Sequence, residues 1–328
     1  YKRDDLIRKI WWEKFSLPKK IKADKCDVFL SLYQCPTILS NKIVKEHLMI
    51  VHDIIPKFRP DYLDNWRKKV YWKLTEFGIK KAGHIVAISK RTEKDLIQQL
   101  GIDPKKITAS YISVDEIYNR GVSEQESLRV MEKYGLEKGY IYSGGGLEVR
   151  KNTEGTIRAY KILLDSDKDR FAKLKDVPPL VISGKLMPQL APLVTDAQAL
   201  VDSMGIGNRV KILGFVPQED LPALYRNAVL FCYPSFYEGF GLPVLEAMCQ
   251  GTPVVTAKNS SLPEVGGDGV LYCNPSDVEE IARVMRKILL DDHLYQTLSE
   301  KGKKRSLNFS WDKFTEKILN IIKNNSIK

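Results

Sequence analysis

The sequence has few residues of the kinds that build disulfide frameworks or metal sites. Its five cysteines are odd in number, scattered from Cys26 to Cys273, and contain no C-x-x-C pair. This pattern argues against a disulfide framework or a zinc site and favours a reducing compartment. Of the four histidines only His47 and His52 are close, and their spacing of five fits no common metal motif. We therefore predict no metal cofactor and a cytoplasmic location.

Long apolar runs are also missing. No stretch of about 18 apolar residues occurs, so no helix is expected to cross a bilayer. The chain opens without an apolar segment of signal-peptide type and without Met, so we expect that Tyr1 is not the natural start. Hydrophobic residues make up 43 % and charged residues 28 %, which is typical of folded globular proteins. A length of 328 residues then favours two domains.

Positive charge is concentrated in the first third of the chain. The net charge is +11, and residues 1–120 hold 25 Lys/Arg against 15 Asp/Glu. This excess indicates an anionic partner, such as a phosphate-bearing substrate, a lipid headgroup or nucleic acid, or else a solvated face without a partner. No nucleic-acid-binding motif occurs, so we predict no nucleic-acid partner. The segment Arg8–Phe15 mixes basic residues with Trp11 and Trp12. These tryptophans either contact a membrane surface, as in interfacial helices, or pack in the core.

Short apolar runs alternate with amphipathic stretches along most of the chain. This pattern predicts parallel βαβ units, and therefore an α/β protein with helices on both faces of its sheets. The polar segment 115–126 predicts a boundary between an N-terminal domain (1–120) and a C-terminal domain (121–310), followed by a last helix (311–328) that can pack back on the first domain. The N-terminal domain holds roughly four strands rather than the five or six of a doubly wound domain, so we expect it to lack early strands. The predicted strands are 28–32, 48–51, 85–88, 107–113, 140–142, 180–182, 210–213, 229–233 and 254–256, and a helix is predicted at 191–204.

The most informative stretch is Pro234–Val255, which reads PSFYEGFGLPVLEAMCQGTPVV and follows a predicted buried strand. It predicts a Gly-rich turn into a helix whose first position suits Pro243. The N–H groups at a helix N-terminus attract an anion, and the donors expected here belong to Gly241, Leu242 and Val244. Two glutamates, Glu238 and Glu246, then fit as acceptors for hydroxyls on either side of a bound diphosphate. The alternative is that both are solvated surface residues.

This stretch resembles the E-x7-E motif of the retaining glycosyltransferases of family 4. The resemblance covers about residues 45–325 and implies a GT-B fold, in which two Rossmann-like domains face each other across a cleft. It implies a nucleotide diphosphate sugar as donor, with no metal required. Glu238 would contact the donor sugar as a catalytic residue, and Glu246 would hold the ribose hydroxyls. The backbone facing the sugar and the diphosphate would belong to Gly239, Phe240, Gly241 and Leu242.

Three further stretches of the C-terminal half resemble this family. YSGGGLEVRKN (Tyr142–Asn152) matches a strand-loop-helix segment in which Arg150 and Lys151 would clamp the leaving diphosphate. Many members carry an Arg directly after the leading Gly, where this chain has Gly146, so Arg150 would substitute. The stretch 211–217 resembles a loop beneath the nucleobase, and Lys185 follows a strand that would line the same cleft. The additional donor-binding candidates are Gly145, Gly214, Phe215, Val216 and Lys185.

In the N-terminal half, VHDIIP (Val51–Pro56) resembles the h-H-D-x-x-P segment of a mannosyltransferase-like branch of the family. His52 would then be catalytic and reach the donor sugar, while Asp53 would orient it or approach the acceptor. Otherwise a histidine at a strand end is a structural residue. Ser89 is expected to be a helix N-cap. The D-x-D patterns within residues 165–169 follow a helix rather than a strand, so we predict a solvated loop there and not a metal site.

The resemblance implies transfer of a hexose to a glycan or a polyprenyl-diphosphate-linked glycan in surface polysaccharide synthesis. It favours GDP-mannose as the donor. The basic N-terminal domain would allow peripheral contact with the cytoplasmic face of a membrane. Two alternatives remain: a sugar-nucleotide epimerase or phosphorylase on the same scaffold, and a non-catalytic subunit that binds nucleotide sugar.

Overall fold

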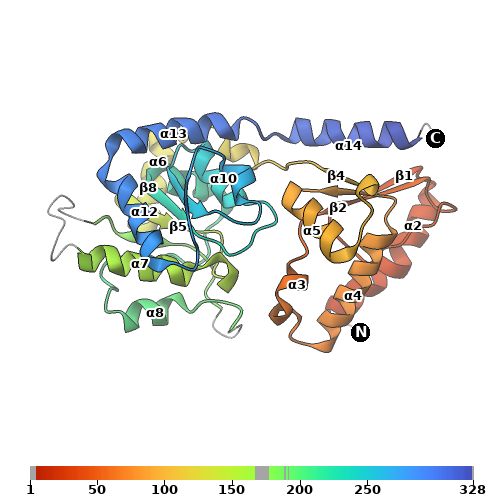
Figure 1. The fold of residues 1–328 in the computed structure, drawn as a ribbon, viewed down its shortest axis with the longest axis horizontal. Coiled ribbons are helices and arrows are strands. Elements are labelled where there is room, and N and C mark those ends of the chain that lie inside the picture. Colours follow the sequence, from red (N-terminus) through yellow and green to blue (C-terminus); the bar gives the residue numbers. More distant parts are fainter. Residues whose placement is uncertain (1–4, 167–176, 188–189, 191, 327–328) are drawn as a thin grey trace. The chain divides into compact units, whose positions relative to one another are not determined.

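The computed structural model describes residues 5–166, 177–187, 190 and 192–326. The chain divides into two compact units, coloured along the sequence in Figure 1. The N-terminal unit is Tyr1–Ile112 with Ser310–Lys328, and the C-terminal unit is Ser113–Phe309. Each has its own parallel sheet, as expected for a protein of the α/β class. Asp167–Asp169 of the D-x-D patterns lie outside the described residues.

Two kinds of feature are absent from the described part of the chain. No helix among residues 5–166, 177–187, 190 and 192–326 is both long and apolar enough to span a membrane. Within the same ranges, no three His, Cys, Asp or Glu side chains gather closely enough to hold a metal ion.

The sheet of the N-terminal unit has four parallel strands in the order β1-β2-β3-β4, close to the predicted strands. Both faces of β2 and β3 are apolar and buried: Met49 and Ile85 are almost fully buried on one face, and Leu48 and Val86 on the other. Helix α14 returns to this unit, and Lys317 Nζ donates to the carbonyl of Ala109 at the end of β4 (2.5 Å). The elements are α1 (Asp5–Trp11), η1 (Trp12–Ser16), α2 (Leu17–Asp24), β1 (Val28–Ser31), β2 (Glu46–Val51), α3 (Ile55–Phe58), η2 (Pro60–Leu63), α4 (Trp66–Lys81), β3 (His84–Ala87), α5 (Lys90–Leu100), η3 (Pro104–Lys106), β4 (Ile107–Ala109) and α14 (Trp311–Ser326).

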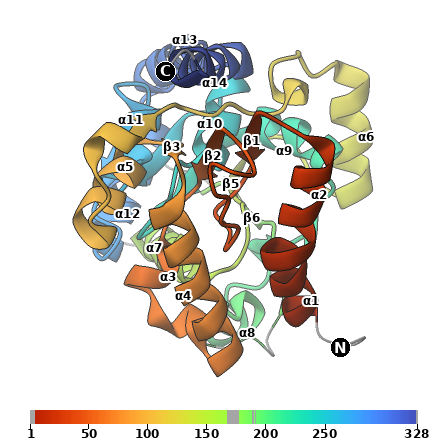
Figure 2. The ribbon, with the colours of Figure 1, turned by 90° about the vertical axis from the view of Figure 1, so that its right-hand side faces the viewer.

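From Asp5 onward, α1 passes through the π-helical turn η1 into α2 as one continuous helical run (Figure 2). A π-helical turn changes the angular spacing of side chains within a helix. Here Glu13 turns inward and is only 1 % exposed, whereas Trp11 and Trp12 are 59 % and 49 % exposed. The structure therefore excludes the alternative in which these tryptophans pack in the core.

The sheet of the C-terminal unit has six parallel strands in the order β10-β9-β8-β5-β6-β7. The strand order reverses between β5 and β8, and α/β sheets place ligands at such a switch point. Helices α7 and α12 pack against each other and against β8 (Figure 1). Helix α9 contacts β5 and β8, and α10 contacts β8 and β9. The elements are η4 (Glu116–Tyr118), α6 (Glu124–Tyr134), β5 (Tyr140–Ser143), η5 (Val149–Lys151), α7 (Thr153–Ser166), β6 (Leu180–Ile182), α8 (Ala197–Ser203), β7 (Val210–Ile212), η7 (Gln218–Asp220), α9 (Leu221–Asn227), β8 (Ala228–Tyr233), α10 (Leu242–Cys249), β9 (Val254–Ala257), α11 (Leu262–Gly266), β10 (Leu271–Cys273), α12 (Val278–Leu290) and α13 (Asp292–Ser306).

Three elements differ from the sequence-based prediction. Strand β4 ends at Ala109, whereas the strand was predicted to run to residue 113. The helix predicted at 191–204 is only α8, which starts at Ala197 because the Asp196 side chain caps it by accepting from the N–H of Ala199 (3.0 Å). Strand β10 was not predicted. It has three residues, two of them only partly buried, so it lacks the buried apolar run that identified the other strands.

Candidate functional site

Glu238 is a buried carboxylate with three side-chain partners. It is 8 % exposed, and its Oε2 lies 2.7 Å from Nη1 of Arg150. Its Oε1 accepts from the hydroxyl of Tyr233 at the end of β8 (2.6 Å) and from Ser235 Oγ (2.9 Å). Glu238 is therefore not the solvated loop residue of the alternative interpretation. The structure brings two of the predicted catalytic residues, Glu238 and Arg150, into direct contact.

Arg150 is fixed by the same network. Its Nε donates to Glu148 Oε2 (2.7 Å) and its Nη1 donates to the carbonyl of Tyr237 (3.1 Å). Burial alone would lower the pKa of Arg150, but the charges of Glu238 and Glu148 raise it, so the guanidinium stays ionised. Two carboxylates already compensate this cation, and in this geometry its observed task is to orient Glu238.

Lys151 lies where the loop after β5 approaches the two glutamates of the motif. Burial lowers the pKa of Lys151, whereas the charges of Glu238 and Glu246 act in the opposite direction. Its Nζ donates to the carbonyl of Gly145. An ammonium has three N–H donors and this contact uses one of them, so the others can turn toward a ligand.

The glycines of this loop leave room for that ammonium. Gly145 and Gly146 have φ angles of +91° and +105°, a region that side chains disfavour. A Cβ on Gly146 would lie 3.3 Å from Lys151 Nζ, and one on Gly145 would lie 3.0 Å from Pro243 Cγ. The Lys151 ammonium thus lies beside the position from which a family arginine would project. This is a physical reason for the glycine at position 146.

Glu246 lies one turn inside α10, beside two buried tyrosines. The hydroxyl of Tyr225 donates to its Oε2 (2.8 Å), and Tyr118 also hydrogen-bonds its side chain. Desolvation raises the pKa of Glu246 to about 7, while Tyr225, Lys151 and Tyr118 act in the opposite direction. Neither tyrosine was predicted as a site residue, because each reaches Glu246 from a different element of the chain.

The raised pKa of Glu246 predicts pH-dependent nucleotide binding. Ionised Glu246 accepts hydroxyl hydrogens better than its acid form, and a pKa near 7 makes the ionised fraction fall about tenfold from about pH 8 to about pH 6. We expect nucleoside diphosphate affinity, measured by calorimetry, to fall several-fold over that range. Glu246→Gln is the matched control, since its remaining pH dependence reports the ligand's phosphate. Equal pH profiles for both proteins would refute the assignment.

The same raised pKa affects folding stability. By linkage, ionisation of Glu246 destabilises the unliganded protein as pH rises through about 7.

The turn before α10 is held by two serines. Ser260 Oγ accepts from the N–H of Glu238 (3.1 Å), and Ser261 Oγ donates to the carbonyls of Glu238 and Phe240 (2.9 and 2.7 Å). The Phe240 ring is buried against Phe309, so only its backbone can face a ligand. Sequence reasoning missed these two serines as supports of the site.

The start of α10 contradicts the prediction for one of the three N–H donors. Gly241 is the N-cap residue, with φ of +117°, and a Cβ there would lie 2.9 Å from Leu262 Cδ2. The N–H of Val244 donates to the carbonyl of Gly241 (3.0 Å). The prediction that Val244 offers its N–H to an anion is therefore wrong, because the first helical turn already uses it. Gly239 is buried in the turn, and Leu242, the first residue of α10, is partly exposed.

The loops after β6 and β7 meet at the same edge of the sheet. The N–H of Gly184 donates to the carbonyl of Gly214 (2.8 Å), which joins the segment carrying Lys185 to the predicted nucleobase loop. Lys185 is exposed, Phe215 is 72 % exposed, and Val216 is buried. The predicted donor-binding residues thus gather at the carboxyl ends of β5 to β8, around the switch point.

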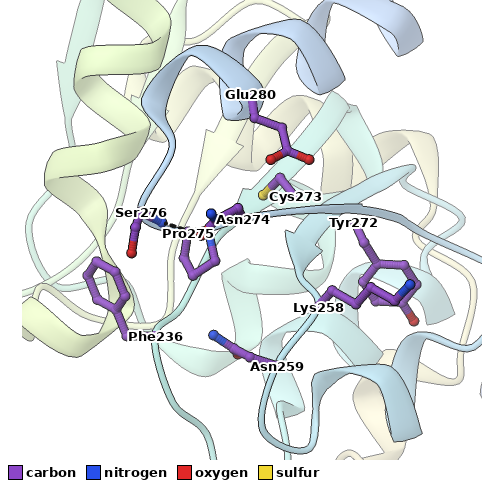
Figure 3. Close-up of a pocket in the computed structure, with 9 residues that line it drawn as sticks. All are labelled: Phe236, Lys258, Asn259, Tyr272, Cys273, Asn274, Pro275, Ser276 and Glu280. Atoms are coloured by element: carbon purple, nitrogen blue, oxygen red, sulfur yellow. Dashed lines mark hydrogen bonds between the residues drawn. The ribbon is translucent and has the colours of Figure 1, made fainter.

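A separate cavity of about 460 Å³ opens at the carboxyl ends of β9 and β10 (Figure 3). No predicted donor-binding residue lines it, and it lies toward the edge of the sheet rather than at the switch point. We therefore do not assign the donor to it. Its lining residues are Phe236, Lys258, Asn259, Tyr272, Cys273, Asn274, Pro275, Ser276 and Glu280.

In the N-terminal unit, His52 is held at the end of β2. Its N–H donates to Gln34 Oε1 (3.1 Å), and its carbonyl accepts from Thr92 Oγ1 (3.1 Å). Its ring Nε2 lies 2.9 Å from the carbonyl of Leu32, so Nε2 carries the proton and Nδ1 is the acceptor. Asp53 Oδ1 accepts from the N–H of Ile55 at the start of α3 (2.9 Å). Through this hydrogen bond, Asp53 stabilises the N-terminus of α3.

The helix after β3 begins as predicted. Ser89 Oγ accepts from the N–H of Thr92 (3.0 Å), which makes Ser89 the N-cap of α5. His47, to which no catalytic role was given, is 3 % exposed, and its Nε2 lies 2.8 Å from Ser31 Oγ.

Comparison with known families and proteins supports this description. The family model "Glycosyl transferases group 1" matches residues 124–305, and "Glycosyltransferase Family 4" matches residues 1–116. The chain is 32 % identical to the O-antigen chain mannosyltransferase B of Escherichia coli, over 89 % of this chain and 74 % of that protein. It is 33 % identical to the serotype-specific mannosyltransferase WbdA of Escherichia coli, over 84 % of this chain but only 33 % of that longer protein.

Solved structures show the same architecture. A glycosyltransferase from Rickettsia africae superposes with a TM-score of 0.72 at 17 % identity, covering 99 % of this chain and 83 % of that one. At 17 % identity this similarity supports the assignment of the fold alone.

Proposed function

Because this chain belongs to the family 4 (group 1) glycosyltransferases, we propose that it transfers mannose from GDP-mannose, with retention of configuration, to a glycan or lipid-linked glycan of a surface polysaccharide. The predictions of this family, of a glycosyltransferase activity and of the GT-B fold are confirmed. The observation that carries the proposed reaction is the Glu238–Arg150 pair beside Lys151 at the switch point. The mannosyltransferase relatives support the choice of sugar.

The proposed donor site assigns one task to each group. Ionised Glu246 accepts from the ribose hydroxyls, and Glu238 accepts from hydroxyls of the sugar. Lys151 and the N-terminus of α10 stabilise the charge that develops on the leaving nucleoside diphosphate. These groups would replace a divalent metal. His52 Nδ1, from the N-terminal unit, would accept from the sugar. No side chain is assigned as general base, and in front-face attack the leaving phosphate takes the acceptor proton.

A thermal-shift screen with GDP-, UDP- and ADP-sugars tests the donor. A ligand at about one hundred times its Kd stabilises the folded state by about 2.7 kcal/mol. We expect a rise of several degrees in Tm with GDP-mannose and smaller rises with the other donors. Folded protein that shows no shift with any of them would contradict the proposed donor site. A larger shift with another base would change the donor and leave the site intact.

Activity assays separate the alternative functions. An epimerase would convert the donor without an acceptor, and a phosphorylase would require free phosphate. A non-catalytic subunit would show the thermal shift but transfer no sugar, even to crude lipid acceptor.

The helical run α1–η1 also supports peripheral contact with a membrane. Trp11, Trp12 and Phe15 are each about half exposed, and a cavity of about 590 Å³ is lined by Trp11, Trp12, Arg8 and Ser16. Aromatic rings beside basic residues are typical of interfacial helices.

This contact predicts salt-sensitive binding to anionic vesicles. Exposed rings enter the interface while the basic residues meet lipid headgroups, and salt screens the second contribution. We expect cosedimentation with phosphatidylglycerol vesicles that weakens as salt rises and falls several-fold in Trp11→Ala/Trp12→Ala. Trp66→Ala is the control, because Trp66 is 67 % exposed but belongs to α4. Vesicle binding that changes neither with salt concentration nor in Trp11→Ala/Trp12→Ala would contradict this proposal.

A further inference from the structure

A second binding feature lies in the N-terminal unit, next to His52. A cavity of about 390 Å³ is lined by His52, Gln34, Tyr33, Tyr71 and Trp72, among others. Its volume falls in the range of about 300–1,000 Å³ that is typical of small-molecule sites. Gln34 joins the cavity to the end of β2, since its Oε1 accepts from the N–H of His52 and its Nε2 donates to the carbonyl of Asp53 (3.2 Å).

A buried carboxylate organises one wall of this cavity. Glu13, placed inward by the π-helical turn, accepts from the hydroxyls of Tyr33 (2.8 Å) and Tyr71 (3.2 Å). Lys9 Nζ lies 3.9 Å from Glu13 Oε1 and 4.8 Å and 5.1 Å from the ring centroids of Tyr33 and Tyr71. These four residues come from α1, η1, the segment after β1, and α4, so only the fold brings them together.

The phenol groups are oriented for ligand binding. Each phenol donates its hydroxyl hydrogen in a hydrogen bond to Glu13, so its oxygen can act only as an acceptor toward a ligand. Desolvation, followed by the bond to Glu13, raises the pKa of Tyr33 to about 12, and the pKa of Tyr71 is raised by desolvation and by the charge of Glu13. Both phenols thus stay protonated at neutral pH. The wall combines aromatic faces with fixed acceptors.

We propose that this cavity binds the terminal pyranose ring of the glycan acceptor, in contact with Tyr33 and Tyr71, and that Glu13 positions the two phenols. The inference rests on the proposed function. A pyranose ring has an apolar C–H face that packs on aromatic rings and hydroxyls that donate to phenol oxygens. The Gln34 link places this ring beside His52, the group assigned to the reacting sugar.

Two other ligands fit less well. An isoprenoid chain needs apolar walls and would leave the Glu13–Tyr33–Tyr71 network without a ligand partner. A phosphate needs cations to balance its charge, but each of the two lysines that line the cavity already lies beside a carboxylate: Lys9 is 3.9 Å from Glu13, and Lys68 is 2.9 Å from Asp64. The neutral, hydroxyl-rich sugar is the ligand that uses both features of the wall.

Steady-state kinetics of the full chain test this assignment. The probes are methyl glycosides of di- and trisaccharides ending in mannose, glucose, galactose or N-acetylglucosamine, used with saturating donor. We expect Tyr71→Ala to raise the KM for the best glycoside at least about tenfold, with kcat changed far less, because the loss is in ground-state binding. Tyr71→Phe keeps the ring and should therefore raise this KM less than Tyr71→Ala does. Glu13→Gln should also raise the KM less than Tyr71→Ala does. The control is Phe77→Ala on α4, an aromatic residue that is 50 % exposed and outside the cavity.

The outcomes separate this inference from the proposed function. The nucleotide-induced thermal shift should be unchanged in Tyr71→Ala. If that shift is present but no glycoside of the panel saturates the enzyme, the inference is overturned. It is also overturned if KM matches the wild type, or if only a lipid-linked acceptor, and no free glycoside, is affected. Absence of any nucleotide-induced shift in the wild type would instead reject the proposed function itself.

Discussion

Glu238→Gln is expected to lower kcat by about 10²–10³-fold while donor binding persists. The carboxylate accepts from Tyr233 and Ser235 and is paired with Arg150 at 2.7 Å, so its position is fixed before substrate arrives. Glutamine keeps the size and one acceptor oxygen but loses the charge that the transition state requires. Initial rates with GDP-mannose, together with a thermal shift by GDP, measure the two effects separately.

The control for this substitution is Glu148→Gln. Glu148 is the second carboxylate on Arg150, at 2.7 Å from Nε, but its side chain is 39 % exposed. We expect it to change kcat by less than about threefold, since exposed ion pairs contribute little. Full turnover by Glu238→Gln would show that the assigned catalytic role is wrong. Glu238→Ala is a weaker test, because removing one partner of a buried pair costs about 3–5 kcal/mol of stability.

Lys151→Met should reduce kcat by a similar factor of about 10²–10³, because it removes a cation that opposes charge on the leaving diphosphate. Methionine keeps much of the length and apolar stem of lysine, so the packing of the loop after β5 is preserved. The expected signature is a fall in kcat and in kcat/KM together, since the interaction strengthens as the bond breaks. A donor with a less basic leaving group should recover part of the rate.

Lys185→Met is the matched control for Lys151→Met. Lys185 is a second cation at the same sheet edge, but it is exposed. It should change donor KM a few-fold at most, as expected for a screened surface charge. If the two substitutions had equal effects, Lys151 would have no special place in the site. If Lys151→Met changed KM alone, its role would be uniform binding.

The parts of the site that the sequence predicted are local in the chain. The spacing between Glu238 and Glu246 follows from a turn that enters α10, and both residues lie near Lys151 because parallel strands end at one sheet edge. The parts that it missed come from distant segments. Tyr118 and Tyr225 reach Glu246 from η4 and α9, and no pattern in a single sequence links positions so far apart.

The same distinction holds for the fold. Buried strands of the C-terminal unit were predictable because each is a continuous apolar run flanked by helical patterns. For Trp11 and Trp12 the sequence left two alternatives open, membrane contact or packing in the core. No residue type marks the π-helical turn beside which Glu13 is buried while both tryptophans are exposed.

That turn also carries an evolutionary implication. An α-helix advances about 100° per residue, so a π-helical turn can be regarded as an α-helix that has accepted one inserted amino acid. Deleting a single codon within 14–16 would restore the ordinary winding and rotate the preceding segment, which includes Glu13, by about that angle. Glu13 would then leave the interior. A one-residue length change among homologues at this point would therefore mark those that had gained or lost the tyrosine-lined wall.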